Sequence, residues 1–229
     1  MTIPAGIVEI LNPVPVTVTE DQVTARLRRP ATVESLRPMI RELLALTREK
    51  AAPKAVYRTS LAVHRGKKLF VDDVFMTNYV PLLRFDTPEI VFPYVATCGT
   101  EIDNLDIPKT DFMRYYVLNM IKESMLFLTG EYLKKYLVDR YPLKDLSHIG
   151  PGEAFGPISQ QKTLFSLIGD VETMIGVRLS PHHLMVPEKS TSGMFFETSA
   201  EIERCRICPQ KKCVARRQPY EPEILNRYR

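Results

Sequence analysis

The clearest pattern in the chain is a helical repeat from Asp111 to Arg140, in which apolar residues recur at three- or four-residue spacing. This spacing predicts one long amphipathic helix, which Gly130 bends or divides in two. A leucine-rich stripe between Thr32 and Pro53 predicts an earlier helix with Thr32 as its cap. We interpret the stripe of the long helix as core; it consists of Phe112, Tyr116, Met120, Met125, Leu128, Tyr132, Leu133, Tyr136 and Leu137.

The period changes between Ala55 and Val95, where short apolar runs alternate with turn residues. This pattern predicts several strands, with Gly66 in a hairpin turn. The acidic residues after Thr100 predict a helix start, and residues 141–158 are rich in Gly and Pro and predict a loop. The mixed order of elements predicts an α+β fold with a mixed or antiparallel sheet and long helices.

Composition describes an ordinary globular protein, because hydrophobic residues make up 45% and charged residues 25% of 229 residues. We expect one α+β domain over residues 1–197 and a small basic appendage with cysteines over residues 198–229. No apolar run reaches the length of a membrane span, and no segment reads as a secretion signal. The expected location is therefore cytoplasmic.

The net charge of +4 is modest, and the excess of Lys and Arg lies in the last part of the chain. Such a tail suits an acidic partner or a nucleic acid. Its aromatic residues, Tyr220 and Tyr228, do not alternate with the basic residues as they would on a base-stacking surface. Nucleic-acid binding is therefore kept only as a third hypothesis.

The loop over residues 147–159 contains three glycines and two prolines, which is more than a connection between helices needs. Glycine lets a ligand approach the backbone closely, and proline stiffens the loop. Amides at the start of the next helix can receive a carboxylate or carbonyl oxygen. A rigid surface loop without a ligand is the alternative interpretation.

This loop and five other segments resemble the activation domain of vitamin-B12-dependent methionine synthase. The match is close over residues 94–196 and loose over residues 30–93, as expected for a stand-alone form with a different C-terminal tail. The matching segments are Tyr94–Ile102, Ser147–Pro157, Gln161–Phe165, Ile175–Ser180, Met185–Pro187 and Ser190–Phe196.

The resemblance implies an accessory or reactivation factor for a corrinoid (cobalamin) methyltransferase in methionine biosynthesis and one-carbon metabolism. Such a domain docks on a corrinoid-carrying partner and presents S-adenosylmethionine to the cobalt, so that reduction is coupled to methyl transfer. Whether the chain itself is an enzyme stays open.

The resemblance also places an S-adenosylmethionine site on the loop. In this register His148 stands where the family has Arg, and Glu153 stands where it has Tyr. The alternative is that this surface contacts a corrinoid protein but does not bind S-adenosylmethionine. The implied cofactor-binding residues are His148, Pro151, Gly152, Glu153 and Gly156.

Three of the four cysteines lie together in the tail, as Cys205, Cys208 and Cys213 with C-x2-C-x4-C spacing. In a chain expected to be cytoplasmic, this clustering favours metal chemistry over disulfides. Thiolates alone suit an iron–sulfur cluster or zinc, and a reducing cluster would fit corrinoid activation. Candidates for a fourth ligand are Cys98, His182, His183, a partner residue or an open cluster position. We interpret Cys98 itself as a small buried side chain.

Two hypotheses follow beside nucleic-acid binding. The first is a reactivation factor with S-adenosylmethionine and an iron–sulfur cluster in the tail. The second is a non-catalytic adaptor that binds a corrinoid protein and uses the tail as a structural zinc site. The metal in the tail distinguishes them.

Overall fold

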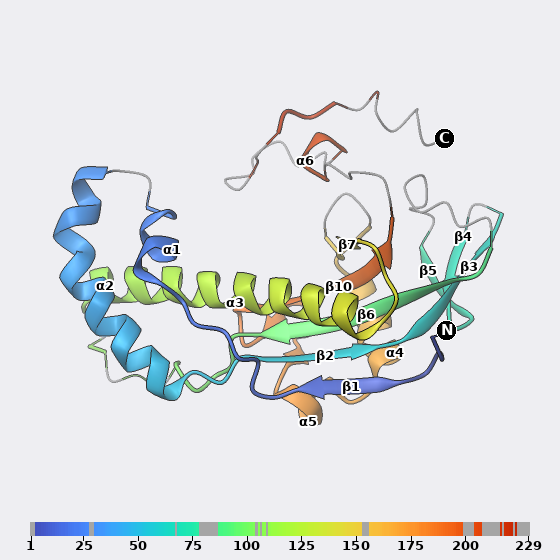
Figure 1. Ribbon diagram of the computed structural model, residues 1–229, viewed down its shortest axis with the longest axis horizontal. Helices are drawn as coiled ribbons and strands as arrows, with labels where there is room; N and C mark the ends of the chain where they lie inside the picture. Colours follow the sequence, from blue (N-terminus) through green and yellow to red (C-terminus); the bar gives the residue numbers. More distant parts are fainter. Residues whose placement is uncertain are drawn as a thin grey trace.

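The computed structural model has an antiparallel sheet at its centre with helices on both faces, which confirms the α+β prediction (Figure 1). It describes residues 3–27, 30–66, 68–77, 87–103, 105, 107–108, 110–152, 156–198, 204–207, 216, 218–221 and 223. The strands are β1 (Val8–Leu11), β2 (Lys54–Arg58), β3 (Ser60–Arg65), β4 (Lys68–Val71), β5 (Val74–Thr77), β6 (Glu89–Thr97), β7 (Leu146–Ile149), β8 (Arg178–Leu179), β9 (Met185–Val186) and β10 (Ser190–Glu197). The helices are α1 (Glu20–Thr24), α2 (Pro30–Lys50), α3 (Phe112–Arg140), α4 (Gln160–Ile168), α5 (Val171–Ile175) and α6 (Arg204–Ile207).

Strand β6 is central because it pairs with three other strands, all antiparallel. Its C-terminal half pairs with β2, its N-terminal end pairs with β3, and β10 runs along its other side. From β3 the sheet continues to β4 and β5, and from β2 to β1. Strand β7 pairs with β10, which makes it an edge of the sheet.

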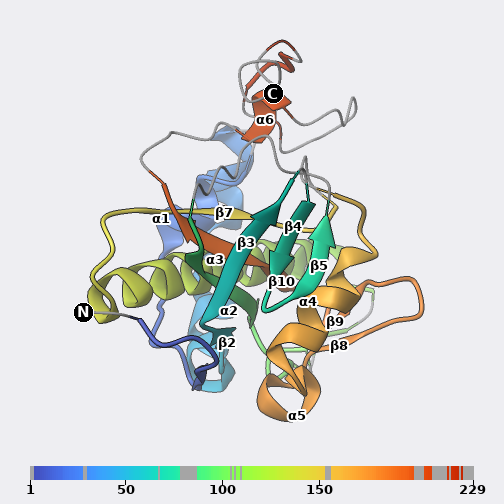
Figure 2. The same ribbon diagram turned by 90° about the vertical axis from the view of Figure 1, so that its right-hand side faces the viewer.

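The two faces of β6 carry different helices because side chains alternate along a strand. Phe92, Tyr94 and Ala96 pack against Leu133 and Leu137 of α3. On the opposite face, Val95 of β6 and Val56 of β2 pack against α4 and α5. Figure 2 shows this layered order, with α4 and α5 on the side of the sheet away from α3. Because both faces are covered, β6 is apolar along nearly its whole length.

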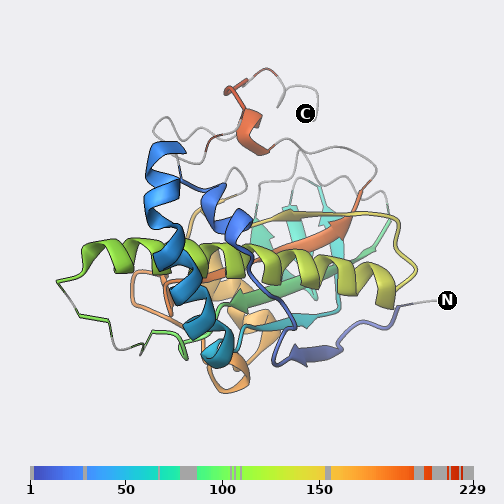
Figure 3. The same ribbon diagram turned by 60° about the vertical axis from the view of Figure 1, so that its left-hand side comes forward.

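Helices α1 and α2 form a second layer with the first half of α3. Val23, Ile40 and Ile121 have no exposed surface in this layer. Helix α2 crosses α3, as the blue and green ribbons in Figure 3 show. The start of α2 differs from the prediction, because the helix begins at Pro30 rather than after Thr32. Proline suits the first helical position, since its missing N–H has no partner there in any helix.

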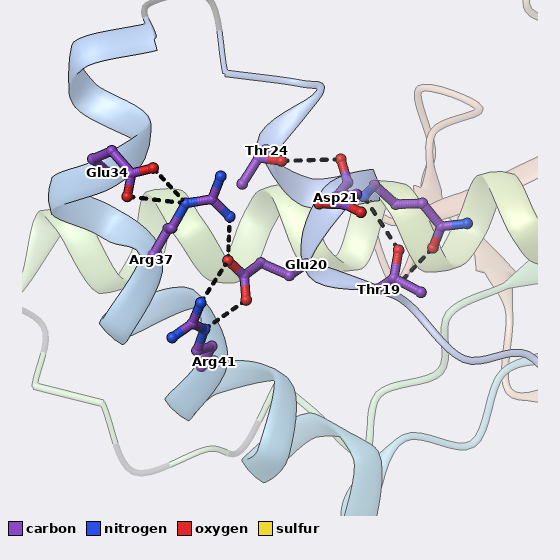
Figure 4. Close-up of polar contacts among 8 residues, drawn as sticks. Thr19, Glu20, Asp21, Thr24, Glu34, Arg37 and Arg41 are labelled. Carbon is purple, nitrogen blue, oxygen red and sulfur yellow. Dashed lines mark hydrogen bonds and ion pairs between the residues drawn. The ribbon is translucent and has the colours of Figure 1, made fainter.

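Charged side chains join α1 to α2 (Figure 4). Glu20 accepts hydrogen bonds from Arg41 Nε at 2.6 Å and from Arg37, while Arg37 Nε also contacts Glu34 at 3.0 Å. Thr19 caps α1, since its Oγ1 accepts from the Gln22 amide and the Gln22 side chain accepts from the Thr19 amide. The ion pairs therefore hold together two helices that share one apolar core.

Helix α3 is continuous over 29 residues, so Gly130 does not divide it. Asp111 begins the helix, because its side chain accepts a hydrogen bond from the Arg114 amide at 3.0 Å. The core assignment was wrong for two members of the predicted stripe, since Phe112 is 80% and Tyr116 is 45% exposed. These residues lie on the N-terminal part of α3, away from the residues that pack on the sheet.

Two other local predictions were also wrong. Residues 141–158 contain strand β7, although their composition predicted only a loop. Residues 101–103 form a turn rather than a helix start. The acidic residues of this turn instead form ion pairs, Glu101 with Lys54 and Asp103 with Lys122.

The N-terminal arm is attached to the sheet at a cluster of tyrosines. Glu9 of β1 accepts hydrogen bonds from the hydroxyls of Tyr57 and Tyr136, and the Tyr57 and Tyr141 hydroxyls lie 3.1 Å apart. Burial raises the pKa of Tyr57, and the bond to Glu9 raises the pKa of Tyr136 to about 12. One carboxylate thus connects β1, β2 and the end of α3.

Among the residues that the structure describes, no helix is long and apolar enough to cross a membrane.

Candidate ligand site at strand β7 and its loop

His148 lies on the edge strand β7, opposite Phe195 of β10. Its ring lies edge-on to two aromatic rings, with centroids 5.8 Å from Phe195 and 6.4 Å from Tyr94. Tyr94 and Phe195 stack on each other at 4.4 Å and are almost fully buried. The half-buried imidazole therefore forms the outer end of an aromatic stack on the α3 face of the sheet.

Gly193 makes this stack possible. A Cβ at this position would lie 2.5 Å from the Ile149 carbonyl oxygen and 3.2 Å from the Tyr94 ring. Gly193 pairs with Tyr94 across the strands, so the missing side chain leaves room for the Tyr94 ring beside it. This glycine fixes how closely β7 and the aromatic stack approach β10.

The chain leaves β7 through Gly150, Pro151 and Gly152. Gly150 is buried, Pro151 is half-buried and Gly152 is exposed with φ of +82°, a backbone conformation that favours glycine. The Gly152 amide donates to the Gly156 carbonyl at 3.0 Å and closes the loop. The candidate residue Glu153 lies outside the described residues, so its predicted role is a proposal.

Gly156 is buried, with φ of +147°. A Cβ there would come within 3.0 Å of three atoms of the Gln160 side chain. Gln160 Nε2 in turn donates to the Met76 carbonyl of β5 at 2.7 Å. Gly156, which the motif predicts as ligand-binding, thus lies against the side chain of Gln160, a contact that the motif did not predict.

The amides at the start of α4 already have partners. The amides of Gln160, Gln161 and Lys162 donate to carbonyls three residues earlier, at 3.0 to 3.2 Å. Ser159 occupies the cap position without a side-chain capping bond, so it does not cap the helix as predicted. These three amides are therefore already bonded within the turn, and an anion site at this helix start stays a prediction.

Cys98 is buried at the end of β6, as expected, with 1% of its surface exposed. Burial raises the pKa of its thiol to about 12, so the thiolate that binds metals is disfavoured at neutral pH. Its Sγ lies 3.6 Å from the Gly99 carbonyl oxygen. Cys98 is thus enclosed by the core and does not face the surface.

The histidines considered as ligands lie at the turn between β8 and β9, where His182 is exposed and His183 has φ of +61°. In Figure 2 the β8–β9 hairpin lies beside α4, low in the view, while α6 is at the top. His182 and His183 are therefore remote from the described part of the tail.

The described tail residues contact one another. Arg206 forms a two-bond ion pair with Glu221, and the Glu221 amide donates to the Arg206 carbonyl. Arg216 donates to the Cys205 carbonyl at 2.6 Å. Cys205 is half-buried. Cys208 and Cys213 lie outside the described residues, and within those residues no group of three or more His, Cys, Asp or Glu side chains gathers.

Four residues of this region escaped the sequence interpretation: Tyr94, Gly193, Phe195 and Gln160. The first three lie inside the matched segments, but their contact depends on the pairing of β6, β10 and β7, which a single sequence does not specify. Gln160 gave no signal, because its partner is a backbone carbonyl 84 positions away.

No protein-family model matches the chain, and no curated protein sequence matches it. Among solved structures, the chain is similar to the crystal structure of the MetH reactivation domain bound to AdoHcy. The TM-score is 0.63, and the alignment covers 89% of this chain and 83% of that chain. The sequences are 13% identical, so the likeness shows the fold. The protein has the reactivation-domain fold that its sequence motifs implied.

Proposed function

We propose that the protein is an accessory factor for a corrinoid methyltransferase and binds an S-adenosyl ligand at the loop after β7. The observation that carries this proposal is the fold likeness, over most of both chains, to a reactivation domain described as bound to AdoHcy. The chain's own sequence motifs support it, because the matched loop directly follows His148. The corrinoid stays on the partner protein.

The residues at the loop suit such a ligand in three ways. Gly152 is exposed without a side chain, so a ligand can lie against the backbone. His148 is a half-buried imidazole, which donates to a carboxylate when it is protonated. Glu153 and a sulfonium carry opposite charges, which attract at short range. S-adenosylmethionine, when bound, supplies the methyl group, and the protein supplies its position relative to the partner.

A titration with AdoHcy, followed by calorimetry, tests ligand binding. We expect saturable binding to the unaltered protein and its loss in Gly152→Val, because a branched side chain fills the approach to the backbone and strains a φ of +82°. Gly66→Val is the matched control, since Gly66 has φ of +65° in the β3–β4 hairpin, outside the proposed ligand site. Equal binding by both variants would refute the placement of the ligand.

A second experiment tests the role in corrinoid chemistry. A corrinoid protein in its cob(II) state is mixed anaerobically with titanium(III) citrate as electron donor, S-adenosylmethionine and the chain. One electron reduces Co(II) to Co(I), and the methyl group then moves from sulfur to cobalt and leaves AdoHcy. We expect the chain to accelerate the rise of methyl–cobalt absorbance; an unchanged rate would contradict the proposal.

For the tail, we propose that Cys205, Cys208 and Cys213 bind an iron–sulfur cluster, with zinc as the alternative. The Arg206–Glu221 ion pair supports this, because it closes the segment that contains Cys208 and Cys213. A fourth ligand then comes from a partner or remains open, because Cys98 is buried and the turn with His182 and His183 lies away from α6. Nearby Arg and Lys residues would offset the negative charge of a cluster.

Metal analysis of anaerobically purified protein tests the tail. We expect iron and sulfide with visible absorbance, and their loss in Cys208→Ser with an unchanged melting temperature of the main domain. Cys98→Ser is the matched control and should retain iron. Zinc, or no metal, in the unaltered protein would refute the cluster.

The adaptor without a nucleotide cofactor is the second candidate. The observation that favours it is the bonding within the loop, since the Gly152 amide and the first amides of α4 already have backbone acceptors. Binding of a corrinoid protein without AdoHcy binding, together with zinc in the tail, would be its signature.

A further inference from the structure

Strand β5 contains a bulge at Met76. Phe70 pairs with Phe75, but Leu69 pairs with Thr77, so Met76 is an extra residue. A bulged residue loses its place in the hydrogen-bond ladder, and its polar groups need other partners. The Met76 carbonyl finds its partner in the side chain of Gln160, at 2.7 Å.

The same Gln160 side chain lies against Gly156. Its Oε1, Cδ and Nε2 lie 2.8, 2.9 and 3.0 Å from the place where a Cβ of residue 156 would be. Gly156 is therefore held between Gln160 and the backbone of its own loop. Its carbonyl accepts the Gly152 amide, so the position of Gly156 determines how the loop closes.

We propose that Gln160 is a positioning residue that fixes the loop after β7 to the bulge of β5. This inference depends on the proposed function only because the proposed function assigns the ligand to that loop. The connection runs from Met76 through Gln160 and Gly156 to Gly152. Figure 2 shows α4, which carries Gln160 at its start, beside β5. Fixing Gly152 and Gly156 before a ligand arrives lowers the entropy cost of ordering these two residues on binding.

Two substitutions separate hydrogen bonding from packing. Gln160→Glu keeps the shape of the side chain but replaces the N–H donor with a carboxylate, which repels the Met76 carbonyl. Gln160→Ala removes both the donor and the contact with Gly156. The matched control is Ser159→Ala, because Ser159 is the exposed neighbour whose side chain makes no capping bond.

Amide hydrogen exchange of the Gly152 N–H, measured without ligand, tests the connection directly. We expect Gln160→Glu and Gln160→Ala to speed this exchange at least tenfold, while exchange in β6 and the melting temperature stay close to those of Ser159→Ala. Unchanged exchange at Gly152 would overturn the proposal. So would faster exchange throughout the domain, because Gln160 would then act through global stability.

Titration with AdoHcy distinguishes this proposal from the proposed function. If the unaltered protein binds AdoHcy, both Gln160 variants should weaken the affinity about fivefold or more, and Ser159→Ala should not. Equal affinities would overturn the positioning role even if exchange at Gly152 changes. If the unaltered protein does not bind AdoHcy, the ligand assignment fails, and the exchange result alone supports or overturns the connection between loop and bulge.

Discussion

Single residues at the candidate site have roles that their immediate neighbours in sequence do not reveal. His148 could be predicted because it follows from a motif. Tyr94, Phe195 and Gly193 could not be assigned to the site, since their contact depends on strand register, which a single sequence does not specify. The loop glycines were predicted as ligand-binding, but the structure gives Gly156 a second role beside Gln160.

Gly193→Ala tests the close approach of β7 and β10. The new Cβ would lie 2.5 Å from the Ile149 carbonyl oxygen, and a backbone atom cannot move aside without shifting β7. We expect a loss of unfolding free energy of about 2–3 kcal/mol, as for other overpacked sites. Denaturant unfolding checks this; a stability equal to that of the unaltered protein would mean that the strands lie farther apart.

Secondary-structure elements were predicted unequally well. Helix α3 was predicted within one residue at its start, because its apolar spacing persists over many turns. Strand β7 was missed, since Leu146 and Ile149 are buried on opposite faces and the two residues between them are polar. The turn after Thr100 was mistaken for a helix start because its acidic residues pair with lysines distant in sequence. Tertiary contacts outweighed local pattern at both places.

Gly130→Ala tests the continuity of α3. A Cβ at this helical position meets no atom within 4 Å, so alanine adds helix propensity without a clash. We expect a gain in unfolding free energy of about 0.5–1 kcal/mol. Thermal unfolding of both variants checks this, because Gly130→Ala should raise the melting temperature and Gly193→Ala should lower it. A destabilised Gly130→Ala would show that a glycine is needed on this face of α3.

Glu9→Gln tests the attachment of β1. Burial raises the pKa of Glu9. Hydrogen bonds from Tyr136 and Tyr57, with Arg140 nearby, lower it by more than burial raises it, so the net pKa is below 4.5. Replacing the carboxylate weakens two bonds to a charged acceptor, so we expect a loss of about 1–3 kcal/mol at neutral pH. Glu131→Gln on the exposed side of α3 is the control. The difference should shrink as acid protonates Glu9; a difference that persists at pH 2 would contradict this account.

The whole molecule joins a sheet domain, a helical layer and a basic tail, and only the first two follow from patterns of apolar residues. The motifs over residues 94–196 implied the fold that the structure and its likeness to the reactivation domain confirm. The boundary between the domain and the tail, predicted near residue 197, stays a prediction. Ion pairs between helices could not be predicted, because pairs such as Arg114 and Glu42 are 72 positions apart.

Stability of the whole molecule should fall in acid. Hydrogen bonds and nearby cations lower the pKa of Glu20 and Glu42 below 4.5, and hydrogen bonds lower that of Asp145 and Asp170 below 3.8. A carboxylate with a lowered folded-state pKa stabilises fully above its unfolded pKa and loses this contribution as pH falls through the folded value. Melting temperatures should be level from pH 7 to 5 and drop below about pH 4.5, less steeply in high salt. A rise in melting temperature over the acid range would contradict this assignment.

The central claim is that an S-adenosyl ligand binds at the loop after β7. An NMR titration of isotope-labelled protein with AdoHcy tests it most directly, because each backbone amide reports on its own surroundings. We predict that the largest shifts fall on the amides of Ser147 to Gly152 and on Phe195, and that α1 and α2 stay unchanged. Absence of shifts at millimolar ligand, or shifts centred on another part of the chain, would contradict the claim.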